Sequence, residues 1–486
     1  MHSFSRIPLA LLFLFLSLFY YASHFPIAAS NEGSHFALVK SLAEEGVFVT
    51  DSNFKYHMQN DFAYRDGHFY ADRAPGTALL SVPFYFLGKL YAAHLDDAND
   101  RELRVKNIVL FGPALFGAAT VVLLILCLLQ LGLSERTSWL AGLLFAFASQ
   151  HWKFSSHLFS HVYLSALVVL AWYLLIKDSL KAPSTLMRRA FYLTLGVLPF
   201  FGYESLVLLP AFLFGRFILI RPFLTGTFSK RILVHIDSAI WFSVPILFLM
   251  VIHWICWGTP FKTFGEFQNP YHWGNTSLAT FFNTPLWLGL YIRLFNFPHE
   301  QYDCPIGLFA LHPMLFVGLF GYLYFFRLRP KEASIQFLLT LSLVLFFAKM
   351  WDWCGGSSGD PRYLLPVLWT FFLPFAFLLE HGLKKVSSEY IKAILQTAMG
   401  FLCGIAFFIC FVHFSRFHGH DFDIKTINHY SPISGEAFFG ILSKVFISFD
   451  KIYLLAYAQI AVLLFFFIVG MMLRIIKKLR TSRVEV

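Results

Sequence analysis

Long apolar runs separated by short polar loops extend along the whole chain. The runs at 107–130, 158–176, 234–257, 305–326 and 453–475 are each long enough to cross about 30 Å of hydrocarbon as a helix. Slightly shorter runs at 7–23, 335–350 and 363–380 are read as further spans. Because backbone polar groups find no water inside lipid, such spans must be helical. The pattern therefore predicts an all-α polytopic membrane protein.

The composition supports this prediction. Hydrophobic residues make up 57% of the chain and charged residues only 14%, whereas ordinary soluble domains are about one-quarter charged. The net charge of +10 would also suit a nucleic-acid partner. However, Lys and Arg are concentrated in short loops beside the apolar runs, as is typical of cytoplasmic loops. We therefore expect membrane orientation to explain the charge, and no nucleic acid among the partners.

The basic loops orient the chain in the membrane. Placing them in the cytoplasm, together with Arg6, gives about twelve transmembrane helices and two cytoplasmic termini. The basic residues that fix this orientation are Lys177, Lys181, Arg188, Arg189, Arg216, Arg221, Lys230, Arg231, Arg327, Arg329, Lys331, Lys384, Lys385, Lys477, Lys478, Arg480 and Arg483. The run 7–23 is read as the first span rather than as a cleaved signal peptide, because it exceeds the usual apolar core of about 7–15 residues.

The predicted topology makes residues 1–486 one transmembrane domain with three long external segments. The first, 24–106, far exceeds a typical connection of about 4–6 residues, and the others are 258–303 and 415–452. Apolar periodicity within the first predicts helices at 34–45 and 77–94 that lie at the membrane surface. The ionisable residues between these helices include Asp51, Asp61, Asp66, Asp72 and Arg73.

Further ionisable and polar residues gather on the same predicted external face. His161, Glu204, Arg362 and Tyr363 all lie beside apolar runs. Ionisable residues close to the hydrocarbon are costly and tend to mark function. Each one alone also fits a solvated span end, a snorkelling arginine or a packed histidine. Their concentration on one face is what predicts a site there.

Several short motifs follow one another in a recognisable order. Residues 31–46 read NEGSHFALVKSLAEEG and residues 66–76 read DGHFYADRAPG. They are followed by LFSH at 158–161, WGTPF at 257–261 and GGSSGDPRY at 355–363. Together they resemble bacterial members of the GT-C superfamily, the polytopic glycosyltransferases that include protein O-mannosyltransferases and lipid A aminoarabinose transferases. The second motif is similar to the "GhxYsDKaPG" element of those proteins.

The resemblance implies a transferase that moves a sugar from a polyprenyl-phosphate donor to a lipid, glycan or protein acceptor. The reaction would take place on the outer face of a bacterial cytoplasmic (inner) membrane, by one displacement that inverts the anomeric centre. An acid just after the first span would act as general base, which by position is Glu32. Many relatives carry Asp-Glu where this chain has Asn31-Glu32, so Asp61 and Asp72 remain candidates.

The resemblance also implies how the donor is held. Arginine suits phosphate oxygens, so Arg362 and Arg73, which stands where relatives often have Lys, are expected to bind the donor phosphate. His161, Tyr363 and Glu204 are the further candidates for contacts with the donor phosphate or sugar. Some GT-C enzymes use a divalent metal, but the only compact ligand run, at 418–421, is too short to establish one.

Two alternatives follow from the same features. A transporter or flippase of lipid-linked saccharides would also need about twelve spans, but it would be expected to show matched halves. Residues 1–240 and 241–486 show no such repeat. A catalytically inactive assembly protein with a GT-C fold is the second alternative, since fold does not establish reaction and Asn31 departs from the relatives.

Overall fold

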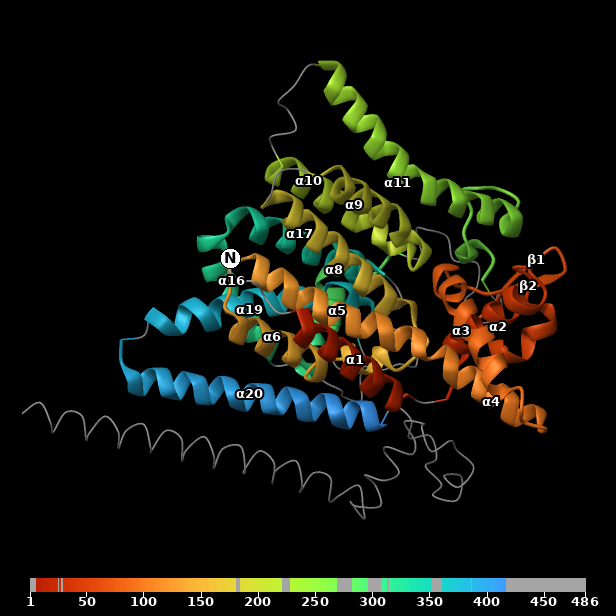
Figure 1. The fold of residues 1–486 in the computed structure, drawn as a ribbon, viewed down its shortest axis with the longest axis horizontal. Coiled ribbons are helices and arrows are strands. Elements are labelled where there is room, and N and C mark those ends of the chain that lie inside the picture. The colour runs from red at the N-terminus through yellow and green to blue at the C-terminus, as the bar shows by residue number, and fades with distance from the viewer. Residues whose placement is uncertain are drawn as a thin grey trace, which may run out of the picture.

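A computed structural model describes residues 6–24, 26–27, 29–180, 184–220, 228–268, 282–295, 307–312, 314–350, 361–385 and 387–416. Within these ranges the chain is almost entirely helical (Figure 1). The predicted span 453–475, nearly all of the loop 415–452 and residues 355–360 of the last motif lie outside the described residues.

Five helical segments of the described chain are long and apolar enough to cross a membrane. They are Ala98–Gln130, Ser160–Ser179, Ile232–Trp257, Pro330–Lys349 and Arg362–Gly382, and shorter apolar helices cover Ile7–Ala22, Leu286–Phe295 and Met314–Leu328. These segments coincide with seven of the eight apolar runs that the sequence predicts as spans. The all-α polytopic fold is therefore confirmed, whereas the count of about twelve spans stays a prediction.

The spans form one bundle in which sequence neighbours and distant helices pack together. α1 (Arg6–Ala22) and α8 (Ser160–Ser179) both pack on α5 (Phe111–Gln130), and α9 (Thr185–Val197) packs on α11 (Phe228–Trp257). α10 (Leu209–Leu219) and α14 (Leu286–Phe295) pack on α17 (Pro330–Lys349), while α16 (Met314–Leu328) packs on α19 (Phe372–Phe377). The remaining helices of the bundle include α6 (Glu135–Phe147), α7 (His151–Ser155), α18 (Leu365–Leu368) and α20 (Glu389–Arg416).

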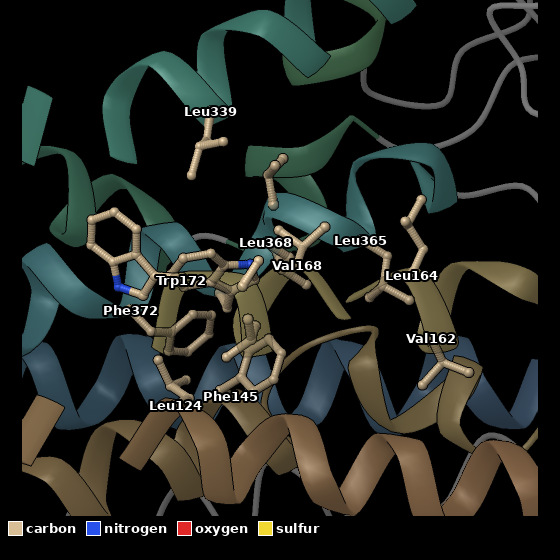
Figure 2. Close-up of a cluster of buried hydrophobic side chains, with 14 of the residues drawn as sticks. Leu124, Phe145, Val162, Leu164, Val168, Trp172, Leu339, Leu365, Leu368 and Phe372 are labelled. Atoms are coloured by element: carbon tan, nitrogen blue, oxygen red, sulfur yellow. The ribbon is translucent and has the colours of Figure 1, made fainter. Parts of the chain in front are cut away.

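The core of the bundle is built from large apolar side chains on helices far apart in the sequence. Figure 2 shows Trp172 of α8 beside Phe372 of α19, with Phe145 of α6 and Leu124 of α5 below them. The rings of Trp172 and Trp369 lie 6.0 Å apart, and neither side chain is exposed. This packing holds α8 against residues 362–372, and both segments carry candidate residues in their first turn.

The segment between α1 and α5 forms a separate lobe at one end of the bundle (Figure 1). It contains α2 (Ser30–Glu44), the 3-10 helix η1 (Asp51–His57), the hairpin β1 (Ala63–Arg65) and β2 (His68–Tyr70), α3 (Gly76–Ala92) and α4 (Ala98–Val109). Helices thus form at both places where periodicity predicts them. α2 packs on α3 and η1, and α3 packs on α4, so the lobe has its own small core.

Gly33 allows the lobe to close around α2. A Cβ atom at this position would overlap the carbonyl oxygen of Tyr56 in η1. Only a residue without a side chain lets the two backbones approach this closely. Since Asn31, Glu32 and Ser34 adjoin Gly33, this contact sets the position of the first turn of α2 relative to η1.

Candidate active site

The hairpin of the lobe brings two acidic residues together. Its strands are antiparallel, with Ala63 opposite Tyr70 and Arg65 opposite His68, and they are joined by Asp66 and Gly67, both at positive φ. Asp-Gly is the preferred sequence for such a two-residue turn, because both positions need a left-handed backbone. Continuing this register by two residues places Asp61 opposite Asp72 at the base of the hairpin.

Arg73 lies between these two carboxylates and pairs with both. Its Nη2 is 3.2 Å from Oδ2 of Asp61, and its Nη1 is 2.7 Å from Oδ2 of Asp72. The Asn31 amide, with its oxygen turned toward the guanidinium, accepts from Nη2 at 2.7 Å and from Nε at 2.9 Å. The side chain of Arg73 is only 19% exposed, so these contacts are largely shielded from solvent. Two acids and one amide thus hold a single arginine in place.

Two serines in the first turns of α2 donate further hydrogen bonds to the two carboxylates. Ser30 Oγ donates to Oδ2 of Asp61 at 2.7 Å, and Ser34 Oγ donates to Oδ1 of Asp72 at 2.9 Å. The polar residues at the start of α2 therefore face the hairpin base rather than solvent. This explains why a helix so rich in polar residues is buried over most of its length.

The two carboxylates have different acidities. Burial alone would raise the pKa of Asp61, but Arg73, Ser30 and the charge of Arg362 offset burial and hold that pKa below its usual value. Burial raises the pKa of Asp72 to about 6, against the opposing charge of Arg73. Asp61 also keeps some access, with a 10% exposed side chain, whereas Asp72 has none. Asp61 is therefore the stronger and more accessible acid of the pair.

His57 holds the chain that leads into Asp61. Its Nδ1 lies 2.7 Å from the carbonyl oxygen of Asp61, and its Nε2 lies 2.9 Å from Oγ1 of Thr50. A carbonyl can only accept, so Nδ1 carries the proton and Nε2 accepts from Thr50. Burial lowers the pKa of His57 to about 4, which keeps the ring neutral in this arrangement.

Glu32, the acid that the resemblance implies as base, faces a different partner. Its Oε1 accepts from the backbone N–H of Leu158 at 3.0 Å, and its side chain is buried. This bond joins the first turn of α2 to the segment that leads into α8. The position of Glu32 thus ties the lobe to the bundle within the same site.

A second group of residues lies at the start of α8 and of the last described span. Arg362 and Tyr363 belong to the 3-10 turn η7 (Arg362–Leu364), and the Arg362 guanidinium carbon lies 5.3 Å from the Phe159 ring centre and 5.1 Å from that of Tyr363. The rings of His161 and Tyr363 lie 5.4 Å apart. Three of the predicted donor-binding residues are therefore neighbours, although η7 and α8 are about two hundred positions apart in the sequence.

Arg293 of α14 joins this second group. Its guanidinium carbon lies 5.3 Å from the ring centre of Tyr363 and 5.9 Å from that of Phe347, and Arg293 is only 2% exposed. Two arginines thus lie over one tyrosine ring. The sequence placed Arg293 in an external loop without singling it out, because its apolar neighbours in α14 give the pattern of an ordinary helix.

The two groups of residues interact electrostatically. The charge of Arg362 lowers the pKa of Asp61, and the phenol of Tyr363 helps to raise the pKa of Arg73. The structure therefore brings together Glu32, Asp61, Asp72, Arg73, His161, Arg362 and Tyr363. Among the contacts of the described residues, none joins Glu204 to this set. Glu204 lies in the 3-10 helix Tyr203–Leu208, where burial raises its pKa to about 7.

His35 is a further member that sequence reasoning missed. It lies one turn after Asn31 in α2, is 1% exposed, and has no hydrogen-bond partner among the described residues. Burial and the nearby charge of Arg73 lower the pKa of His35 to about 3, so its ring is neutral. The only signal in the sequence was its place within the NEGSHFAL motif.

The acids of this site do not form a metal centre. Among the described residues, no three His, Cys, Asp or Glu side chains converge as ligands. The cation between Asp61 and Asp72 is the Arg73 guanidinium, which fills the place a divalent ion would need. These residues as arranged do not fit a metal.

Comparison with solved structures identifies the fold of the chain. An archaeal oligosaccharyltransferase, AglB from Archaeoglobus fulgidus in complex with an inhibitory peptide and a dolichol-phosphate, superposes with a TM-score of 0.53 at 11% identity over 88% of this chain. The chain has the GT-C fold. ArnT from Cupriavidus metallidurans in the apo state is also similar, with a TM-score of 0.46 at 14% identity over 82% of this chain. No protein-family model and no curated protein sequence matches the chain.

Both of these solved structures are longer than this protein. The chain spans 60% of the AglB chain and 65% of the ArnT chain. At these identities the likeness establishes the arrangement of helices and leaves the chemistry to the residues of the site.

Proposed function

We propose that this protein is a membrane glycosyltransferase that moves a sugar from a polyprenyl-phosphate donor to an acceptor outside the cytoplasm. The observation that carries the proposal is the buried Asp61–Arg73–Asp72 cluster facing Arg362 at the junction of lobe and bundle. An ionised acid and several arginines within one GT-C fold combine the two groups that such a transfer needs. These are a proton acceptor for the incoming hydroxyl and cations for the departing phosphate.

The arginines are placed to hold the donor phosphate. Arg362 at the start of η7 and Arg293 in the last turn of α14 both lie over Tyr363, and Arg73 follows the hairpin close enough to interact electrostatically with Tyr363. Guanidinium groups offer paired donors that match phosphate oxygens. The complex of AglB with a dolichol-phosphate supports a lipid-linked phosphate as donor.

Asp61 is the proposed general base. It is ionised, it is the more accessible acid of the pair, and Arg73 and Ser30 fix its orientation. The acceptor oxygen attacks the anomeric carbon while its proton passes to the Asp61 carboxylate. The bond from that carbon to the phosphate oxygen breaks, and the lipid phosphate leaves with its negative charge toward the arginines. A single displacement of this kind inverts the anomeric centre.

The outer face of the membrane is the proposed side of the reaction. His161 in the first turn of α8 belongs to the site, while Lys177 belongs to the last turn of the same helix. A helix of this length is about 30 Å long and can cross the hydrocarbon, so its first and last turns lie toward opposite faces of the membrane. Because basic loops stay in the cytoplasm, the end that carries His161 and the lobe is external.

The proposal is tested by transfer of radiolabelled sugar from a panel of polyprenyl-phosphate donors to membrane extracts. Purified wild type is compared with Asp61→Asn, which keeps the size and the hydrogen-bond acceptor but cannot take the proton. Asp66→Asn is the matched control, because Asp66 is exposed in the turn of the same hairpin and Asn tolerates its left-handed backbone. We expect a loss of about a hundredfold or more for Asp61→Asn and none for Asp66→Asn.

The same preparation separates the transferase from a flippase. If wild type transfers no sugar from any donor, while lipid-linked sugar changes leaflet in proteoliposomes, the transferase proposal is wrong. If Asp66→Asn and Asp61→Asn lose the same activity, the assignment of the base is wrong.

A further inference from the structure

A groove on the lobe lies apart from the acid–arginine site. It has a volume of about 300 Å³ and runs between the C-terminal halves of α2 and α3 and the N-terminal half of α4. Its floor is apolar and buried, formed by Phe36, Tyr85, Ala92 and Val105. This volume is at the lower end of ligand pockets, so the groove suits one small group rather than an extended molecule.

The rim of the groove is strongly charged. Lys40, Lys89 and Arg101 line it together with Glu44 and Glu102. Glu44 is engaged by two of its neighbours, accepting from Tyr85 Oη at 2.6 Å and from Lys89 Nζ at 3.1 Å. Arg101 is exposed and has no ion pair among the described residues. The carboxylates are thus occupied by the floor and rim of the groove, while part of its positive charge faces outward.

Further lysines crowd around Tyr56 beside the groove. The ammonium groups of Lys40, Lys55 and Lys106 lie 5.5, 4.9 and 4.9 Å from its ring centre. The Glu102 carboxylate pairs with both Lys55 and Lys106, at 3.3 and 2.8 Å, and it also accepts a hydrogen bond from the Tyr56 hydroxyl. With Lys89 and Arg101, five cations therefore surround two carboxylates. Like charges held this close repel one another, and an incoming anion would relieve that repulsion.

We infer that this groove binds an anionic group, a phosphate or a carboxylate, carried by the acceptor of the transfer reaction. The inference rests on the proposed function for its link to the acceptor. Lys40 and Glu32 belong to the same helix, eight positions apart, which is about 12 Å along the axis. The groove is therefore placed to hold one end of an acceptor whose hydroxyl reaches Asp61. Such an anchor would select charged acceptors over neutral ones of the same shape.

Binding to the groove is measured without any donor. Wild type in phosphatidylcholine nanodiscs is titrated by calorimetry with glucose 6-phosphate and, as its neutral match, with glucose. The test variant combines Lys40→Gln and Arg101→Gln. The control is Arg136→Gln, because Arg136 is likewise exposed near the start of a helix and has no ion pair among the described residues. We expect glucose 6-phosphate to bind and glucose not to, with affinity reduced about tenfold or more in the test variant.

A second arm separates a soluble glycan from a lipid head group as the source of the anion. Native mass spectrometry counts phosphatidylglycerol molecules retained by wild type and by the test variant from mixed nanodiscs. Retention that the test variant loses assigns the groove to a lipid head group, and sugar-phosphate binding alone assigns it to a glycan. If neither probe binds, or if Arg136→Gln weakens binding as much as the test variant does, the inference is wrong.

The two proposals fail separately. Asp61→Asn should keep the binding of glucose 6-phosphate, since that carboxylate is not part of the groove. Anion binding without sugar transfer would overturn the proposed function alone. Sugar transfer without anion binding would overturn only the inference that the groove binds an anionic group.

Discussion

The amide oxygen of Asn31 accepts from two nitrogens of Arg73, Nη2 at 2.7 Å and Nε at 2.9 Å. The Arg73 guanidinium thus pairs with two carboxylates and donates hydrogen bonds to one neutral amide oxygen. An aspartate at position 31 would place a third negative charge beside the same guanidinium. Asn31 therefore holds the Arg73 guanidinium without adding to the negative charge that the two carboxylates already place around it.

Replacing Asn31 by aspartate tests this balance. The added charge would repel a phosphate approaching Arg73. We therefore expect the KM for the donor to rise about tenfold, which corresponds to about 1.4 kcal/mol of lost binding free energy. The kcat should change less, because Asp61 keeps its place. Steady-state kinetics with a polyprenyl-phosphate donor give both values. An unchanged KM would show that the donor phosphate does not approach Arg73.

Glu32 provides a sharp test of which acid is the base. In Glu32→Gln the amide oxygen can still accept from Leu158 N–H, so we expect folding and transfer to be kept. In Glu32→Ala that buried N–H loses its acceptor, which costs about 1–3 kcal/mol of stability. Thermal unfolding in detergent and the transfer assay measure the two effects. A well-folded Glu32→Gln protein without activity would make Glu32 the base, as its position first suggested.

The acidity of Asp72 predicts a titration near the physiological range. Its pKa of about 6 lies above the usual 3.8, so the carboxyl is protonated below about pH 6 and ionised above it. Because the folded state binds this proton more tightly, the stability that the group contributes is full at low pH and is lost as pH rises through 6. Difference infrared spectroscopy should show a carboxyl band that titrates there. The band should be absent from Asp72→Asn and present in Asp66→Asn, and a band that survives Asp72→Asn would disprove the assignment.

Gly33 should be intolerant of any side chain. A Cβ there overlaps the Tyr56 carbonyl, so Gly33→Ala must push η1 from α2, at a cost of about 1–3 kcal/mol. Gly400 is the matched control, since it also lies inside a helix but has open space around its Cβ position. Gly400→Ala should be neutral or slightly stabilising. Thermal unfolding of both variants checks this, and equal effects would contradict the close contact.

The sequence was sufficient for the elements that depend on local pattern. Apolar length predicted the spans, and periodicity predicted helices at 34–45 and 77–94, which the structure gives as Ser30–Glu44 and Gly76–Ala92. The grouping of His161 with Arg362 and Tyr363 came from resemblance, since their contact depends on the packing of α8 against α18. The hairpin at 63–70 is too short to produce a strand pattern, although Asp66-Gly67 is a turn signal.

The roles of the acids depend on geometry that no local pattern contains. Glu32, Asp61 and Asp72 are equivalent as sequence, and only the hairpin register and the position of Leu158 give each a different partner. Arg293 is a similar case, because its partners Phe347 and Tyr363 are more than fifty positions away. Long-range packing of this kind is set by tertiary structure.

We expect Arg293 to contribute to donor binding through the planar shape of its guanidinium as well as through its charge. The group lies over the rings of Tyr363 and Phe347, a position that suits a planar cation. Arg293→Lys keeps the charge but loses the plane and the paired donors, so we expect the donor KM to rise about tenfold while the fold is retained. Arg327→Lys is the control, because Arg327 is exposed in the last turn of α16. If Arg293→Lys binds donor as wild type does, Arg293 acts only as a structural cation over the two rings, and Arg362 and Arg73 hold the phosphate without it.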